Sequence, residues 1–267
     1  MQTISAFGKV QDALSYFVEA YGSIAEYAAV VRRLSGFTAH MEEVDAKESA
    51  VALSKSSGGL EVEGLCVSLP DGTELLKDCS FSLAPGEALL VTGASGAGKS
   101  TLLRALAGLW PFAHGRAAFP ADEKRLFLSQ RPYLPLGTLA RAVAYPLTAQ
   151  GPREEMERAL RLVGMEDFLV RLDEVADWSH ILSLGEQQRI AFARVLLVRP
   201  AWAFLDEATS ALDEAREKEL YEMLARELPE MGVVSVGHRS TLRGQHGREL
   251  HLSGAGGFTT HVLAVST

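Results

Sequence analysis

The residues best suited to chemistry lie in one glycine-rich run. It reads Gly93, Ala94, Ser95, Gly96, Ala97, Gly98, Lys99, Ser100 and Thr101. Because glycine lacks a Cβ atom, this backbone can turn tightly and bring successive N–H groups against phosphate oxygens. Lys99 can then reach the β- and γ-phosphates, and the Ser100 hydroxyl can coordinate Mg²⁺. The run therefore predicts a phosphate-binding loop for a nucleoside triphosphate.

The segments on either side of this loop support the prediction. A short apolar run precedes it and reads as a strand, and from Lys99 onward apolar residues recur at helical spacing. The N-terminus of such a helix turns its partial positive charge toward the same anion. The alternative is an ordinary glycine-rich turn between a strand and a helix. The loop by itself fits kinases, GTPases and transport ATPases.

Two adjacent carboxylates follow another apolar run. Residues Ala201–Leu205 read as a buried strand, and Asp206 and Glu207 come at its carboxyl end. A second such strand, Val233–Val236, leads to His238. Open α/β sheets place ligands beyond the carboxyl ends of their strands. Asp206 can hold the shell of a Mg²⁺ ion, and Glu207 can orient or deprotonate an attacking water. A solvated turn is the alternative for this pair.

Two further polar residues lie at predicted ends of secondary structure. Residues Lys124–Gln130 predict a short strand, which places Gln130 near the expected nucleotide. Ser183 is the predicted N-cap of an apolar helix that continues to Val198 and ends at Pro200. For Gln130 the alternative is a surface glutamine, and for His238 it is a satisfied histidine at a strand end.

Together these motifs occur in the order and spacing of an ABC-type ATPase, which residues 60–255 resemble. They are the glycine-rich loop, Gln130, Leu182-Ser183-Leu184-Gly185-Glu186, Asp206-Glu207, Ser210-Ala211-Leu212-Asp213 and His238. The resemblance implies an α/β fold of P-loop NTPase type with a mainly parallel sheet. It also implies an antiparallel β-subdomain at the start and a helical insertion over about residues 133–185. Strand patterns over residues 60–68 and 75–83 and helical spacing over residues 152–172 agree with it.

The resemblance also assigns roles to single residues. Gln130 is expected to contact Mg²⁺ and the attacking water, and His238 to hydrogen-bond the γ-phosphate. The Mg²⁺ ligands would be Ser100, Gln130 and Asp206. The signature residues are expected to cap the γ-phosphate bound by a second subunit, and the D-loop to lie at the same dimer interface. These two segments are Ser183, Leu184, Gly185 and Glu186 for the signature, and Ser210, Ala211, Leu212 and Asp213 for the D-loop. ATP and Mg²⁺ are the implied cofactors, and a homodimer of nucleotide-binding domains is the implied assembly.

Two features depart from the common family pattern. The signature reads Leu-Ser-Leu-Gly-Glu in place of Leu-Ser-Gly-Gly-Gln, and Leu69 stands where many members stack an aromatic ring on adenine. The adenine contact is therefore not identified. The signature and the preceding Asp177-Trp178-Ser179-His180 resemble one branch of the family. That branch comprises the peroxisomal fatty-acyl (subfamily D) half-transporters and the SbmA/BacA-like permease-ATPase fusions.

The N-terminal segment has a different character. From Ile4 to Phe37 there is no proline and apolar residues step by three and four, which predicts an amphipathic helix over residues 1–37. Residues 38–59 predict a linker, and residues 60–267 the ATPase domain. The helix could cover the domain's own core, dock on a partner or continue a membrane bundle, or be disordered outside its native assembly. The resemblance favours the end of a transmembrane permease domain, fused upstream or separate. This chain would then lie peripherally at the cytoplasmic face of the inner membrane.

Composition excludes several other classes. A hydrophobic fraction of 47 % and a charged fraction of 22 % are typical of globular proteins, and a net charge of −8 argues against a nucleic-acid partner. Cys66 and Cys79 have neither CxxC spacing nor histidine partners, which predicts free buried thiols. No run of 18 apolar residues occurs, and the N-terminus lacks the features of a secretion signal.

These observations predict the ATP-binding and ATP-hydrolysing subunit or fragment of an ABC transporter, which powers transport of an unidentified substrate. One alternative is a non-transport ABC ATPase of DNA repair or translation, which would need a long coiled-coil insertion or paired cassettes. The other is a nucleotide-sensing module without hydrolysis, against which the intact Lys99, Asp206, Glu207 and His238 weigh. The substrate cannot be inferred, because the cargo pathway would lie in membrane segments.

Overall fold

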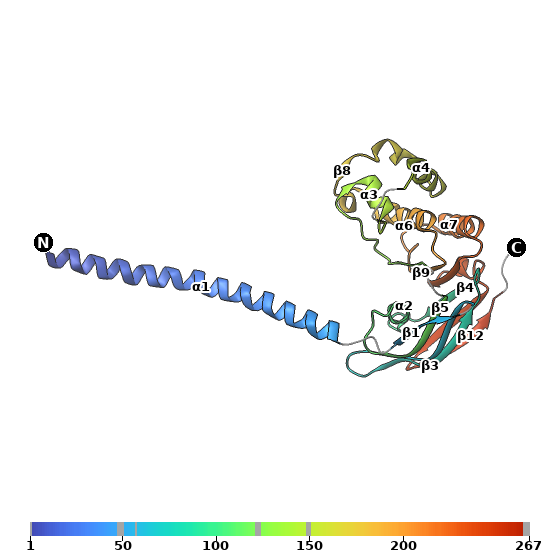
Figure 1. Ribbon diagram of the computed structural model, residues 1–267, viewed down its shortest axis with the longest axis horizontal. Helices are drawn as coiled ribbons and strands as arrows, with labels where there is room; N and C mark the ends of the chain where they lie inside the picture. The colour runs from blue at the N-terminus through green and yellow to red at the C-terminus, as the bar shows by residue number, and fades with distance from the viewer. Residues whose placement is uncertain (1, 47–50, 57, 121–123, 148–150, 264–267) are drawn as a thin grey trace. The chain divides into compact units, whose positions relative to one another are not determined.

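The computed structural model describes the chain apart from residues 1, 47–50, 57, 121–123, 148–150 and 264–267 (Figure 1). The chain forms two compact units, Met1–Glu48 and Ser49–Thr267. The first consists of one helix, and the second holds the described strands and the other helices. All the residues expected to bind a nucleotide belong to the second unit.

The first unit is helix α1, Gln2–Ala46. The predicted helix is present, but it continues past Phe37 because residues 38–46 contain neither glycine nor proline. The predicted linker over residues 38–59 is therefore wrong in extent, and its second half includes strand β1, Val51–Ser56.

Many apolar side chains of α1 are exposed. Their spacing is mostly three or four residues, and together they cover roughly half of the helix circumference. They are Tyr16, Tyr21, Ile24, Tyr27, Val30, Val31, Leu34, Phe37 and Met41. Among the described residues, no helix combines the length and the apolar character needed to cross a membrane.

A four-stranded sheet has the order β1–β5–β2–β3. Its other members are β2 (Leu60–Ser68), β3 (Glu74–Leu83) and β5 (Ala113–Pro120). Strand β2 runs antiparallel to β3 and β5, and β1 runs parallel to β5. The alternating pattern predicts β2 and β3 correctly. It does not predict β5, in which Gly115 and Pro120 weaken the local strand signal.

A six-stranded sheet has the order β12–β11–β4–β10–β9–β6. Its strands are β4 (Ala88–Gly93), β6 (Arg125–Leu128), β9 (Trp202–Asp206), β10 (Gly232–Val236), β11 (Arg248–Gly254) and β12 (Gly257–Val262). Every neighbouring pair is parallel except β11 and β12. The mainly parallel sheet is thus confirmed, and the carboxyl ends of β4, β6, β9 and β10 meet at one edge.

Two hydrophobic cores hold this unit together. One lies between the two sheets and helix α2 (Lys99–Leu106). The other joins β6 and β9 to the helices α3 (Leu139–Ala144), α4 (Arg153–Leu162), α6 (Leu184–Val198) and α7 (Glu214–Glu227). In Figure 1, α3 and α4 lie on the side of α6 away from β9 and the rest of the six-stranded sheet. With the 3₁₀-helix Glu166–Arg171, the pair β7 (Gly137–Thr138) and β8 (Val175–Ala176), and α5 (Trp178–Ile181), they form the expected helical insertion.

The two cysteines are free thiols. Cys79 is buried, and burial raises its pKa to about 12, so that the thiol stays neutral. Cys66 is only half-buried, and its sulfur accepts a hydrogen bond from the Asp78 N–H at 3.3 Å. Within the described part of the chain, no cluster of three or more His, Cys, Asp or Glu side chains could hold a metal ion.

His246 is buried beside Tyr221, and its Nδ1–H donates to the Leu242 carbonyl at 2.7 Å. Burial lowers its pKa to about 4. Between about pH 6.5 and pH 4 the unfolded chain therefore binds more protons than the folded chain, and stability falls as the pH drops. Because of this histidine, the free energy of unfolding is expected to fall by about 2 kcal/mol between pH 7 and pH 5. His246→Asn, which retains a donor for Leu242, should remove that loss in urea unfolding; an equal loss in variant and wild type would contradict the assignment.

Candidate nucleotide-binding site

The predicted phosphate loop joins the end of β4 to the start of α2. Gly93, Gly96 and Gly98 have φ values of 139°, 80° and 97°, which residues with a side chain rarely adopt. A Cβ atom on Gly93 would also lie 2.4 Å from a carbonyl oxygen of β11. The Lys99 ammonium donates to the carbonyls of Gly93 and Ala94 at 3.0 and 2.9 Å. Its charge is therefore held over the loop.

The rest of the loop divides into an exposed face and a buried anchor. Ala94, Ser95 and Gly96 are exposed, whereas Ala97 is buried in the core between the two sheets. Thr101 is half-buried in the first turn of α2. The anchor holds the loop in place while its exposed face can receive a ligand.

Ser100 and Asp206 meet although they are far apart in the sequence. The Ser100 hydroxyl, in the first turn of α2, donates to Asp206 Oδ1 at 2.8 Å. Asp206 is the last residue of β9, which is separated from β4 by β10 alone. A hydroxyl and a carboxylate are ligands of the kind that Mg²⁺ prefers. The donor set thus fits the cation predicted from the sequence.

Glu207 occupies an unusual backbone conformation. Its φ is 49°, a region that non-glycine residues seldom adopt, and its N–H donates to the Val236 carbonyl at 3.2 Å. Gln130, two residues beyond β6, donates from Nε2 to Glu207 Oε2 at 3.2 Å. The ends of β6 and β9 therefore bring these two predicted site residues together.

His238 is exposed and lies two residues beyond the end of β10. It lines a small depression together with Glu207 and Thr209. Four strand ends of one sheet therefore supply the phosphate loop, Asp206 with Glu207, Gln130 and His238.

The signature residues begin helix α6, and the predicted N-cap is confirmed. The N–H and hydroxyl of Ser183 donate to Glu186 Oε2 at 2.8 and 2.7 Å, and the Glu186 N–H donates to Ser183 Oγ at 3.3 Å. This reciprocal capping box fixes the first turn, which Leu184 and Gly185 complete. Glu186, in place of the common glutamine, is therefore a structural acceptor.

The signature lies against the D-loop of its own chain. A Cβ atom on Gly185 would lie 3.2 Å from the Leu212 side chain and 3.4 Å from the Ala211 carbonyl oxygen. Asp213 ends the D-loop as the N-cap of α7, where its carboxylate accepts a hydrogen bond from the Arg216 N–H at 2.8 Å. Signature and D-loop thus form one surface.

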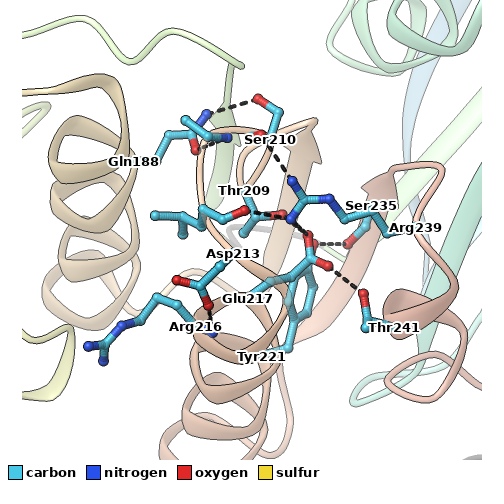
Figure 2. A network of polar contacts seen from close by, with 12 residues as sticks. Gln188, Thr209, Ser210, Asp213, Arg216, Glu217, Tyr221, Ser235, Arg239 and Thr241 are labelled. Atoms are coloured by element: carbon cyan, nitrogen blue, oxygen red, sulfur yellow. Dashed lines mark hydrogen bonds and ion pairs between the residues drawn. The ribbon is translucent and has the colours of Figure 1, made fainter.

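Two residues around this surface escape prediction from the sequence. The buried Gln188 side chain contacts both Ser210 and Ala211, and Arg239 contacts the D-loop from the opposite side (Figure 2). Both stand next to recognised motifs, Gln188 in α6 after the signature and Arg239 directly after His238. Their position beside these motifs is the sequence signal that could have indicated contacts with the site.

A glycine-rich loop that carries lysine and serine, with an acidic residue at the end of a nearby parallel strand, defines a P-loop nucleoside triphosphatase. Comparison with known proteins specifies which one. The sequence profile of the ABC transporter family matches residues 76–210, just over half of the chain. The chain belongs to the ABC transporter family, and it is an ATP-binding domain of that family.

Relatives and a solved structure agree with this assignment. An uncharacterised ABC transporter ATP-binding protein of Haemophilus influenzae is 41 % identical over 94 % of this chain and 42 % of its own length. The chloroplastic ABC transporter D family member 2 of Arabidopsis thaliana is 32 % identical over 95 % of this chain and 46 % of its own. A bacterial Atm1-family ABC exporter with ATP bound matches with a TM-score of 0.67 and 26 % identity, over 78 % of this chain and 39 % of its own. The resemblance to the subfamily D branch is confirmed, and the chain spans less than half the length of each of these proteins.

Proposed function

We propose that two copies of this chain bind Mg-ATP between them, hydrolyse it and thereby power a membrane permease. The observation that carries this proposal is the meeting of Ser100 with Asp206 and of Gln130 with Glu207 at one sheet edge. That arrangement supplies a metal shell and a base beside a phosphate loop.

The phosphates would be bound by the loop amides and by Lys99, which exchanges its two carbonyl acceptors for phosphate oxygens. Ser100, Asp206 and Gln130 would hold Mg²⁺, which neutralises charge on the β- and γ-phosphates when bound. The loop is therefore suited to grip the triphosphate before any chemistry occurs.

In the hydrolytic step, Glu207 would orient a water molecule and accept its proton as the water oxygen bonds to the γ-phosphorus. The bond to the bridging oxygen then breaks, and ADP and phosphate are the products. His238 would hydrogen-bond the γ-phosphate, since it lines the same depression as Glu207. The Gln130 amide lies 3.2 Å from the Glu207 carboxylate, which supports placing the attacking water beside both side chains.

The second copy would close the site. In the described residues, the hydrogen bonds of the Ser183 side chain are to Glu186 and not to the phosphate loop of the same chain. The start of α6 would therefore offer its amides and the Ser183 hydroxyl to the γ-phosphate held by the partner. Because the D-loop lies against Gly185, it would lie at the same interface between the two copies.

The permease would be a transmembrane domain that packs on α1, with this chain at the cytoplasmic face of the inner membrane. The many exposed apolar side chains of α1 support a partner there, and the relatives are more than twice as long as the part they share with this chain. Several apolar spans encoded in frame before Met1, or by a neighbouring gene, would support a permease. The absence of both would argue for a non-transport ATPase.

Phosphate release from purified protein tests the activity itself. We expect release that requires Mg-ATP and rises more steeply than linearly with protein concentration, because the active species is a dimer. Lys99→Ala is the control for contaminating ATPases. Tight ATP binding without phosphate release at any concentration would instead identify a nucleotide sensor.

A further inference from the structure

We propose that Arg239 is a positioning residue that holds the D-loop in the conformation needed for the dimer and connects it to His238. This inference rests on the proposed function. Arg239 directly follows His238, and its guanidinium donates to two D-loop carbonyls, Leu212 from Nη1 at 2.6 Å and Ser210 from Nη2 at 3.2 Å (Figure 2). One side chain therefore spans the D-loop from Ser210 to Leu212.

The guanidinium is itself fixed by a buried carboxylate. Glu217 in α7 is 2 % exposed, and its Oε2 lies 3.7 Å from Arg239 Nη1. Thr209 donates to Glu217 Oε2 at 2.5 Å, and Thr241 donates to Oε1 at 2.6 Å. Because both oxygens of this buried carboxylate accept hydrogen bonds, its position is fixed. A guanidinium held beside it is already ordered and loses little conformational freedom when it also binds the D-loop carbonyls. Glu217 thus fixes Arg239 against the D-loop.

The opposite side of the D-loop is held by Gln188. Its Oε1 accepts from the Ala211 N–H at 3.0 Å, and its Nε2 lies 3.1 Å from Ser210 Oγ and 2.9 Å from the Gln130 carbonyl oxygen. The D-loop is therefore clamped between α6, which carries the signature, and the segment that carries His238. A displacement of His238 on contact with a γ-phosphate would reach the D-loop through the next residue in the chain.

The arrangement requires arginine in particular. Two carbonyl oxygens and one carboxylate surround the guanidinium, and its planar fork can address them together. A lysine ammonium would keep the charge near Glu217 but could not span Ser210 and Leu212 in the same way. Arg239→Lys therefore keeps the positive charge beside Glu217 and removes the simultaneous contacts with the two D-loop carbonyls.

The test uses the full chain with Glu207→Gln, in which ATP is bound but not consumed, and compares it with the same protein carrying Arg239→Lys. We expect the protein concentration for half-maximal ATP-dependent dimerisation to rise about tenfold or more, because charged hydrogen bonds to the interface segment are lost. Binding of ATP to the monomer, which uses the phosphate loop, should keep its Kd. Arg243→Lys is the matched control, since Arg243 also pairs with a glutamate, Glu249, at 3.0 Å.

Amide hydrogen exchange gives a second readout that needs no activity. In Arg239→Lys, residues 209–213 should exchange about tenfold faster, while α2 and α6 keep their protection. Dimerisation and exchange identical to the control would overturn the role of Arg239. Loss of monomer ATP binding or of protection throughout the protein would also overturn it, because the residue would then be merely structural. If the Glu207→Gln protein with intact Arg239 fails to dimerise with ATP, it is the proposed function that fails.

Discussion

Replacing Glu207 with glutamine should slow phosphate release by about 10² to 10⁴-fold, which is the usual contribution of a positioned base. Glutamine has nearly the same shape, so the backbone at φ 49° and the contact with Gln130 need not change. It cannot accept the proton of the attacking water. ATP binding, which depends on the phosphate loop, should therefore persist while turnover stops.

The measurement combines steady-state phosphate release with retention of labelled ATP after rapid gel filtration. We expect the variant to retain ATP as a dimer and wild type to retain little. Glu230→Gln, a change of the same chemistry at an exposed turn, is the control and should behave like wild type. Unchanged hydrolysis in Glu207→Gln would remove Glu207 from its proposed role.

The parts of the site that the sequence predicts correctly are those that local signals specify. A strand, glycine loop and helix in succession define the phosphate loop, and the observed β4, Gly93–Gly98 and α2 follow that pattern. Ser183 as the N-cap of α6 is equally local, since the capping box involves residues three apart. The resemblance then orders these pieces along the chain.

What the sequence does not predict depends on contacts between distant segments. Strand β1 begins at Val51 and pairs with β5, which starts after the phosphate loop. Each strand is stabilised by this distant partner, so its own residues give only a weak strand signal. The role of Arg239 depends on Glu217 and on two backbone carbonyls of the D-loop. Any residue type has a backbone carbonyl, so the residue types of the D-loop do not show that its carbonyls accept from an arginine. In the sequence alone, Arg239 therefore looks like an ordinary surface arginine.

A mixing experiment should show that each site is built from two chains. In the Glu207→Gln background, Lys99→Ala removes the lysine that holds the phosphates, and Ser183→Arg blocks the signature with a bulky side chain. Each variant alone is expected to retain almost no ATP, since both sites of its dimer are damaged. A dimer of one copy of each has one site with both lesions and one with an intact Lys99 and an intact Ser183.

The mixture should therefore recover ATP retention, to about one site in four when the chains pair at random. The control mixture combines Lys99→Ala with a chain carrying both Lys99→Ala and Ser183→Arg, in which no site has an intact lysine. Recovery in the first mixture alone requires that Ser183 act on the nucleotide of the other chain. If Ser183 served its own phosphate loop, both mixtures would stay at the level of the single variants, because no site would then have Lys99 and Ser183 intact together.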